Sequence, residues 1–150
     1  MQKIRVTKSF NFETAHALYG YDGKCKNIHG HSYKLFVTIK GTPIQETNDP
    51  KYGMVIDFGD IKKIVKSVVI DPFDHAILLN GNSPHKSLGD TLVEEGHKVI
   101  FTTYQPSCEN MLIDMVERIQ PLLSPLIELQ ALRLHETETS YAEWLAEDNK

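Results

Sequence analysis

The stretch Cys25-Lys26-Asn27-Ile28-His29-Gly30-His31 places two histidines two residues apart at the start of an alternating segment. Successive side chains of a β-strand point to opposite faces, so His29 and His31 should share one face. Gly30 adds no side chain between them and allows a bound group to approach the backbone closely. Cys25 lies just before the strand, where a loop can fold its sulfur back over the imidazoles. The stretch therefore predicts a site at the end of a strand.

Two alternating segments flank this stretch and predict a pair of strands. Residues 4–12 alternate apolar and polar side chains, and His16 would keep the inward phase if that strand ran on. Residues 32–40 alternate in phase with the two histidines that precede them. Because the two segments are close in sequence, we expect them to pair antiparallel.

Two amphipathic helices are predicted further along the chain. The first begins at Asp57, a favourable N-cap, and should end at Asp71-Pro72, because proline cannot continue a helix. The second follows Ser107 as N-cap and runs to Ile119. Glu109 in its first turn complements the helix dipole.

The remaining segments are two strands and a long connection. Residues 99–101 form a short strand, and 126–137 a last strand with apolar residues in both phases, so both of its faces are expected to be covered. Residues 81–97 are polar and contain glycine, which predicts a long loop inserted in the domain. Helices gathered on one face of a mostly antiparallel sheet make an α+β fold.

Composition limits the function classes. A chain of 150 residues with 41% hydrophobic and 24% charged side chains fits a single domain over 1–150. The formal net charge of -4 argues against nucleic acid as a partner. No segment reads as a signal peptide or as a membrane span, and the two cysteines are expected to be free thiols, so we expect a cytoplasmic protein.

Three imidazoles, those of His16, His29 and His31, are candidates to hold one zinc ion. A catalytic zinc keeps three protein ligands and an open position, whereas structural sites are closed by four ligands rich in cysteine. The alternative is that each histidine is structural or lies at the surface. Cys25 could be a base, an inert thiol or a fourth ligand that closes a structural site, and spacing does not separate these roles.

Three acidic or histidine positions complete the candidates. Asp74-His75 follows a helix end and is either a catalytic pair or a turn and cap. Adjacent residues of an extended segment point to opposite sides, which argues against direct contact between these two side chains. Glu136 would be an inward carboxylate at the end of a buried strand, satisfied by a ligand with two parallel N–H donors or by a salt bridge to Lys or Arg. His85, His97 and His135 are interpreted as surface or loop histidines.

Together these residues resemble the 6-pyruvoyltetrahydropterin synthase and 6-carboxytetrahydropterin synthase family. Six short pieces occur in the family's order across nearly the whole chain, and each is weak alone. They are Phe12-Glu13-Thr14-Ala15-His16, Cys25 to His31, Gly53-Met54-Val55-Ile56-Asp57-Phe58, Asp74-His75, Pro106-Ser107-Cys108-Glu109-Asn110 and His135-Glu136-Thr137.

The resemblance implies a tunnelling fold (T-fold) with four antiparallel strands and two helices on one face. It also implies a homohexamer built as a dimer of trimers, with active sites between subunits. The implied zinc ligands are His16, His29 and His31. Cys25 is the implied catalytic cysteine, Asp74 and His75 an acid/base pair that can meet a neighbouring subunit's cysteine, and Glu136 the pterin-anchoring carboxylate. Ser107 and Glu109 fall in the implied substrate pocket.

The implied reaction acts on 7,8-dihydroneopterin triphosphate. Three residues separate Cys25 from His29, which resembles the 6-carboxytetrahydropterin synthase branch, whose members release acetaldehyde on the route to 7-deazapurines such as queuosine. Two alternatives stay open: a 6-pyruvoyltetrahydropterin synthase and a non-catalytic zinc- or pterin-binding assembly protein. The 81–97 connection and the Ser107-Cys108 pair depart from the family pattern near the implied pocket.

Overall fold

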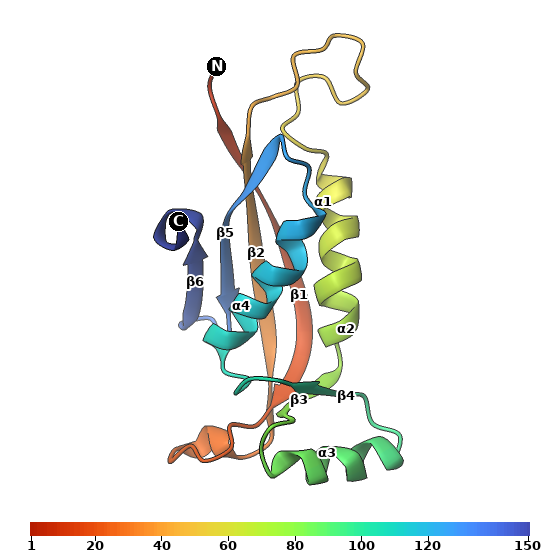
Figure 1. The fold of residues 1–150 in the computed structure, drawn as a ribbon, viewed down its shortest axis with the longest axis vertical. Helices are drawn as coiled ribbons and strands as arrows, with labels where there is room; N and C mark the ends of the chain where they lie inside the picture. The colour runs from red at the N-terminus through yellow and green to blue at the C-terminus, as the bar shows by residue number, and fades with distance from the viewer.

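The computed structural model describes residues 1–150 as one curled sheet with its main helices on one face (Figure 1). The strands are β1 (Ile4–His16), β2 (His29–Gly41), β3 (Ala76–Asn80), β4 (Val99–Thr102), β5 (Ile127–His135) and β6 (Tyr141–Leu145). The α-helices are α1 (Phe58–Val65), α2 (Asp71–Phe73), α3 (His85–Glu94) and α4 (Cys108–Ile119). A π-helical segment (Lys66–Ile70) joins α1 to α2, and short 3₁₀ turns cover Lys24–Lys26, Gln120–Leu122 and Ala146–Asn149.

The sheet has six strands in the order β4-β3-β1-β2-β5-β6, so the expectation of four was wrong. It is also mixed, because β3 runs parallel to β1 and β4 parallel to β3. The expected antiparallel pairing of β1 with β2 is confirmed, from Ile4 opposite Gly41 to His16 opposite His29. The sequence concealed β3 and β6 because neither alternates clearly between apolar and polar residues over its five positions.

A β-bulge in β5 explains why its apolar residues fall in both phases. Thr38 lies opposite Ala131 and Ile39 opposite Leu129, so Gln130 is the extra residue. The bulge shifts the inward phase by one residue and keeps Leu129 and Leu132 both buried. The change of phase, rather than coverage of both faces of the strand, accounts for the pattern.

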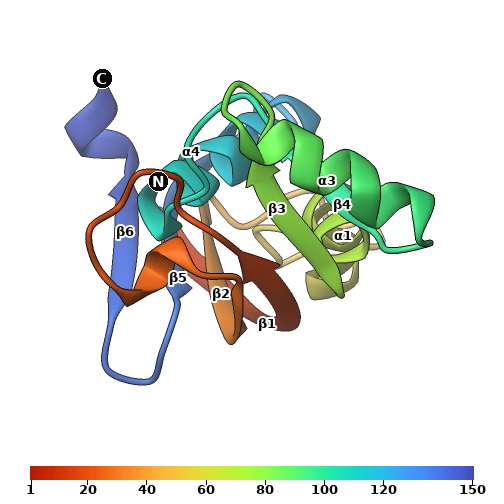
Figure 2. The same ribbon diagram turned by 90° about the horizontal axis from the view of Figure 1, so that it is seen from below.

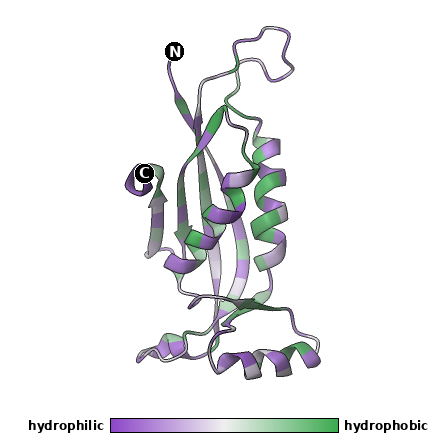
Figure 3. Cartoon of the chain, in the orientation of Figure 1, coloured by the Kyte–Doolittle hydropathy of each residue, from purple (hydrophilic) through white to green (hydrophobic).

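Helices α1 and α4 lie against one face of the sheet (Figure 1) and enclose the core with it. The predicted caps are confirmed: Asp57 accepts a hydrogen bond from the Gly59 N–H, and Ser107 Oγ from the Asn110 N–H. The first helix does not end at Asp71-Pro72, because Pro72 lies in the first turn of α2, where its missing N–H needs no acceptor. Along α1 and α4, hydrophobic residues alternate with hydrophilic ones as an amphipathic helix requires (Figure 3).

The 81–97 segment is not the loop that its composition predicts, since it contains α3. No side chain caps the N-terminus of α3, and Gly89 interrupts it, so the sequence signals of a helix are weak. Gly89 is buried there, and an added Cβ would lie 2.2 Å from an atom of the Phe101 ring on β4. The glycine therefore allows α3 to pack closely on β4. None of the helices is long and apolar enough to cross a membrane.

Candidate metal centre and acid/base pair

The ends of β1 and β2 bring the three predicted histidines together. His16 closes β1, and His29 and His31 open β2 directly opposite, because the two strands pair along their whole length. His16 Nε2 lies 3.0 Å from His29 Nε2, and the ring centroids of His16 and His31 are 5.2 Å apart. The connection between the two strands, β3 and α3 lie at this same end of the molecule (Figure 2).

Backbone carbonyls fix which nitrogen of each imidazole faces the cluster. His16 Nδ1 donates to the Pro106 carbonyl at 2.6 Å, and His29 Nδ1 donates to the Asn27 carbonyl at 2.7 Å. A carbonyl only accepts, so both protons are on Nδ1 and both Nε2 atoms carry free lone pairs in the neutral rings. Two lone pairs facing each other repel unless a cation lies between them. This arrangement fits a metal ion.

Burial favours the neutral form of two of the imidazoles, those of His16 and His31. His16 is almost fully buried, and desolvation lowers its pKa despite the hydrogen bond to Pro106 and the charge of Glu136. Desolvation also lowers the pKa of His31, against the opposing effect of Glu136. Neutral imidazole is the form that binds zinc, so these two rings are ready to act as ligands at neutral pH.

Glu136 joins the cluster from the turn that follows β5. Its Oε1 lies 2.9 Å from His31 Nε2 and 3.8 Å from His16 Nε2. Ligand atoms of His16, His29, His31 and Glu136 all lie within 4.8 Å of one another. Of the two alternatives for this carboxylate, the salt bridge to Lys or Arg is absent. The sequence placed this carboxylate inward but gave no sign that it reaches the histidines.

Cys25 is not among these four residues. It lies in the short 3₁₀ turn Lys24–Lys26, is partly exposed, and its carbonyl accepts a hydrogen bond from the Leu18 N–H at 3.0 Å. The fourth position of the cluster is therefore taken by a carboxylate and not by this sulfur. That arrangement removes the support for a site closed by one cysteine and three histidines.

Asp74 and His75 contact each other, contrary to the expectation from an extended segment. His75 Nδ1 lies 3.0 Å from Asp74 Oδ2. His75 is the only non-glycine residue with positive φ, at 59°, and this left-handed conformation turns both side chains to one side. The hydrogen bond from the Glu13 N–H lowers the pKa of the Asp74 carboxyl. Burial opposes this effect and the contact with His75 adds to it, so the pKa is lowered overall. The carboxylate is thus ionised where it meets the imidazole.

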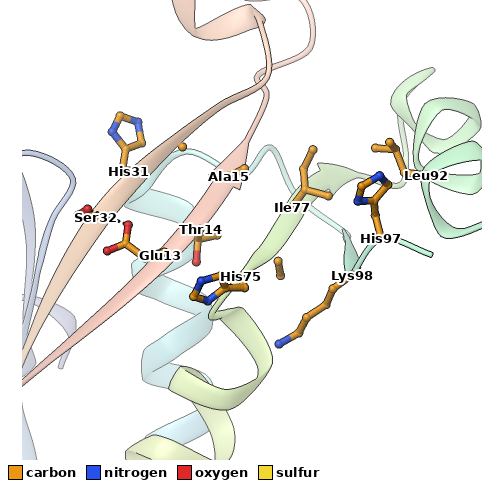
Figure 4. A pocket seen from close by; sticks show the side chains of 12 residues that line it. Glu13, Thr14, Ala15, His31, Ser32, His75, Ile77, Leu92, His97 and Lys98 are labelled. Carbon is orange, nitrogen blue, oxygen red and sulfur yellow. Dashed lines mark hydrogen bonds between the residues drawn. The ribbon is translucent and has the colours of Figure 1, made fainter. Parts of the chain in front are cut away.

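A pocket of about 450 Å³ lies beside this pair. His31 borders it from β2 and His75 from the end of α2, with Glu13 and Thr14 of β1 between them (Figure 4). The side chain of His75 is 76% exposed, so it is free to meet a ligand. Of the cluster only His31 reaches this pocket, because Glu13, Ala15, Gly30 and Ser32, which alternate with the histidines along β1 and β2, form its wall. The pocket therefore belongs to the Asp74-His75 pair, and the imidazoles gather on the other face of the two strands.

His97 and Lys98 also line this pocket, and the sequence did not single them out for it. His97 is exposed in the connection between α3 and β4, in agreement with its interpretation as a surface or loop histidine, and no periodic pattern there indicates that it faces a pocket. Lys98 Nζ donates to the carbonyls of Asp71 and Asp74, at 2.7 and 2.8 Å, which ties the start of β4 to the segment before His75.

Ser107 and Glu109 lie at the start of α4, outside the four-residue cluster. Ser107 Oγ is used as the helix cap, and Glu109 is exposed in the first turn. Cys108 is buried, as predicted, and its thiol lies 3.5 Å from the Leu134 carbonyl. Desolvation, with the charge of Glu136, raises the pKa of Cys108 to about 12.

Known proteins share this fold and this sequence pattern. The family model of 6-pyruvoyl tetrahydropterin synthase matches residues 5–147. A 6-carboxy-5,6,7,8-tetrahydropterin synthase of Haemophilus influenzae is 36% identical over 142 residues, covering 94% of this chain and 98% of the relative. The 6-pyruvoyl tetrahydrobiopterin synthase of Homo sapiens is 28% identical over 150 residues, covering 92% and 88%.

A solved structure agrees with these relatives. The 6-pyruvoyl tetrahydropterin synthase of Caenorhabditis elegans superposes with a TM-score of 0.67 at 25% identity, covering 97% of both chains. The family match spans both the histidine cluster and the Asp74-His75 pair. The chain therefore belongs to the 6-pyruvoyl tetrahydropterin synthase family.

Proposed function

We propose that the protein is a zinc-dependent 6-carboxy-5,6,7,8-tetrahydropterin synthase. It converts 7,8-dihydroneopterin triphosphate into 6-carboxytetrahydropterin and releases triphosphate and acetaldehyde, a step towards 7-deazapurines such as queuosine. The observation that carries this proposal is the convergence of three imidazoles at the ends of β1 and β2. The 36% identity to the Haemophilus influenzae synthase supports the carboxy branch.

His16, His29 and His31 would hold the zinc ion through their Nε2 atoms. Zinc supplies a positive charge that stabilises the anion formed when a hydroxyl of the substrate side chain loses its proton. The three imidazoles are neutral ligands, so the full charge of the ion would remain available to the substrate oxygens.

Proton transfer is assigned to Cys25 and to His75. As thiolate, Cys25 would remove a proton from the substrate side chain, and His75 would return or accept one as the partner acid/base. Asp74 holds the His75 ring by its contact with Nδ1, which leaves Nε2 for the ligand. Both groups are at least partly exposed, which supports a pocket completed by a neighbouring subunit of a homohexamer.

Glu136 would recognise the pterin ring. Its carboxylate can accept two parallel N–H groups from the guanidine-like edge of the heterocycle, a bidentate arrangement that fixes orientation as well as position. Ser107 and Glu109, at the start of α4, would lie along the same substrate pocket.

Product analysis tests this proposal. Purified, zinc-loaded protein is incubated with 7,8-dihydroneopterin triphosphate, and acetaldehyde and the pterin product are quantified. We expect acetaldehyde and 6-carboxytetrahydropterin in equal amounts. The similarity to the Homo sapiens protein favours a second candidate, a 6-pyruvoyltetrahydropterin synthase, which would release triphosphate and give 6-pyruvoyltetrahydropterin without acetaldehyde.

A further inference from the structure

We propose that Glu136 is a metal ligand while the substrate pocket is empty, and that a bound pterin takes this carboxylate away from the metal. The proposal rests on the proposed function and adds a second role for the pterin-binding residue. It predicts that substrate recognition and opening of the metal site are one event.

The first argument is the position of the carboxylate. Glu136 Oε1 approaches two of the histidine nitrogens, at 2.9 and 3.8 Å, and no Lys or Arg pairs with it. A tetrahedral zinc ion with ligands at about 2.1 Å separates its ligand atoms by roughly 3.4 Å. The separations around Glu136, together with 3.0 Å between His16 Nε2 and His29 Nε2, scatter about this value.

The second argument is that hydrogen bonding does not explain the contact. His31 Nε2 is buried and makes no hydrogen bond, although Glu136 Oε1 is 2.9 Å away. The lone pairs of His16 and His29 point into the same space, as their Nδ1 contacts require. A carboxylate beside several nitrogen lone pairs is unfavourable unless a cation neutralises it. A cation bound between the three imidazole nitrogens and the Glu136 carboxylate oxygen would remove this repulsion.

The third argument concerns competition for the carboxylate. The backbone of Glu136 is held where its N–H donates to the Ser140 carbonyl at 3.0 Å, so an exchange involves the side chain alone. A carboxylate that binds a metal through one oxygen cannot also present both oxygens to the two N–H donors of a pterin edge. A pterin would therefore release Glu136 from the metal and free a position there for its own side-chain hydroxyls.

Zinc affinity of two matched variants provides the first test. Glu136→Gln keeps the shape of the side chain but offers a poor ligand, whereas Glu138→Gln makes the same charge change at an exposed position two residues later. We expect zinc affinity, measured by competition with a chelator, to fall about 10- to 100-fold in Glu136→Gln and to stay unchanged in Glu138→Gln. Circular dichroism of the metal-free proteins checks that both variants fold.

The second test uses the cobalt-substituted wild-type protein and 6-methylpterin, which has the pterin edge but no side-chain oxygen for the metal. We expect 6-methylpterin to change the visible d–d bands of cobalt, because Glu136 leaves the ion. Unchanged zinc affinity in Glu136→Gln, or binding of 6-methylpterin without any change in the cobalt bands, would overturn the exchange and leave the proposed function standing. A wild-type protein that binds no zinc would overturn both.

Discussion

Asp74 and His75 are joined side chain to side chain and are both tied to the same residue of β1. His75 Nδ1 lies 3.0 Å from Asp74 Oδ2, while Asp74 Oδ1 accepts from the Glu13 N–H at 2.9 Å. The His75 N–H in turn donates to the Glu13 carbonyl at 2.6 Å. Glu13 lies three residues before His16, so β1 carries a metal ligand and also anchors the acid/base pair. The strand fixes the separation of the two groups.

We expect Asp74→Asn to lower kcat about 10²- to 10⁴-fold, because the imidazole loses the carboxylate that orients it and stabilises its charged form. The amide oxygen can still accept from the Glu13 N–H, so the fold should be kept and only the charge-dependent part of the stability lost. Steady-state kinetics and thermal unfolding measure the two effects. Asp71→Asn, which removes a partner of the exposed Lys66 nearby, is the control and should leave kcat unchanged. Full activity in Asp74→Asn would exclude the pair from catalysis.

Asp74 should also contribute to acid unfolding. The Glu13 N–H is the main group that lowers its pKa, and His75 lowers it further, while burial acts in the opposite direction. A carboxyl with a lowered folded-state pKa contributes stability that is present above its unfolded value of about 3.9 and is lost as the pH falls through the folded value. As the pH is lowered from about 5 to about 2, where such a carboxyl takes up its proton, we expect the free energy of unfolding to fall less steeply in Asp74→Asn than in the wild type. Parallel curves for the two proteins would contradict this linkage.

Replacing Cys25 by Ala should separate the enzyme from a non-catalytic metal protein. Because Cys25 lies outside the four-residue cluster, we expect Cys25→Ala to keep zinc at full occupancy and an unchanged melting temperature. Turnover should be lost, since the proposed base is gone. Metal analysis, calorimetry and product assays give the three readouts. Loss of zinc together with stability would instead assign Cys25 to a structural site.

The sequence predicted the parts of the fold whose pattern repeats over many residues. The long pair β1 and β2 alternates over whole strands, and Asp57 and Ser107 are helix caps with a local hydrogen-bonding reason. The short strands β3 and β6 and the helix α3 were not predicted, because their stability comes from contacts with distant segments. Gly89 is an example: glycine is a poor helix former, but its lack of a side chain leaves room for the Phe101 ring of β4.

The sequence likewise predicted some parts of the candidate site and not others. Strand periodicity was enough to bring His16, His29 and His31 to one place, because phase fixes the face on which a side chain lies. The Asp74 and His75 contact depends on a single positive φ, which no pattern reveals. The inward direction of Glu136 was read correctly, but its approach to the histidines depends on the turn between β5 and β6, whose existence was not predicted.

The two cysteines should differ sharply in reactivity. Burial and the charge of Glu136 raise the pKa of Cys108 to about 12, so at pH 8 only about one molecule in 10,000 carries its thiolate. Cys25 is partly exposed. We expect a disulfide reagent to titrate one thiol per native chain and two per chain in denaturant. Cys25→Ala should lose the rapid native reaction, and two rapid thiols in the native wild type would contradict the burial of Cys108.

Gly89→Ala should destabilise the protein although alanine is the better helix former. Helix propensity favours alanine by about 1 kcal/mol, but the new Cβ would lie 2.2 Å from the Phe101 ring, and such overpacking costs about 1 to 3 kcal/mol. We expect a net loss of about 1 kcal/mol in denaturant unfolding. Ser87→Ala, at an exposed position of α3, should not destabilise. In a Phe101→Leu background, where the clashing ring atoms are gone, Gly89→Ala should stabilise. A stabilising Gly89→Ala in the wild type would show that α3 does not depend on this close contact.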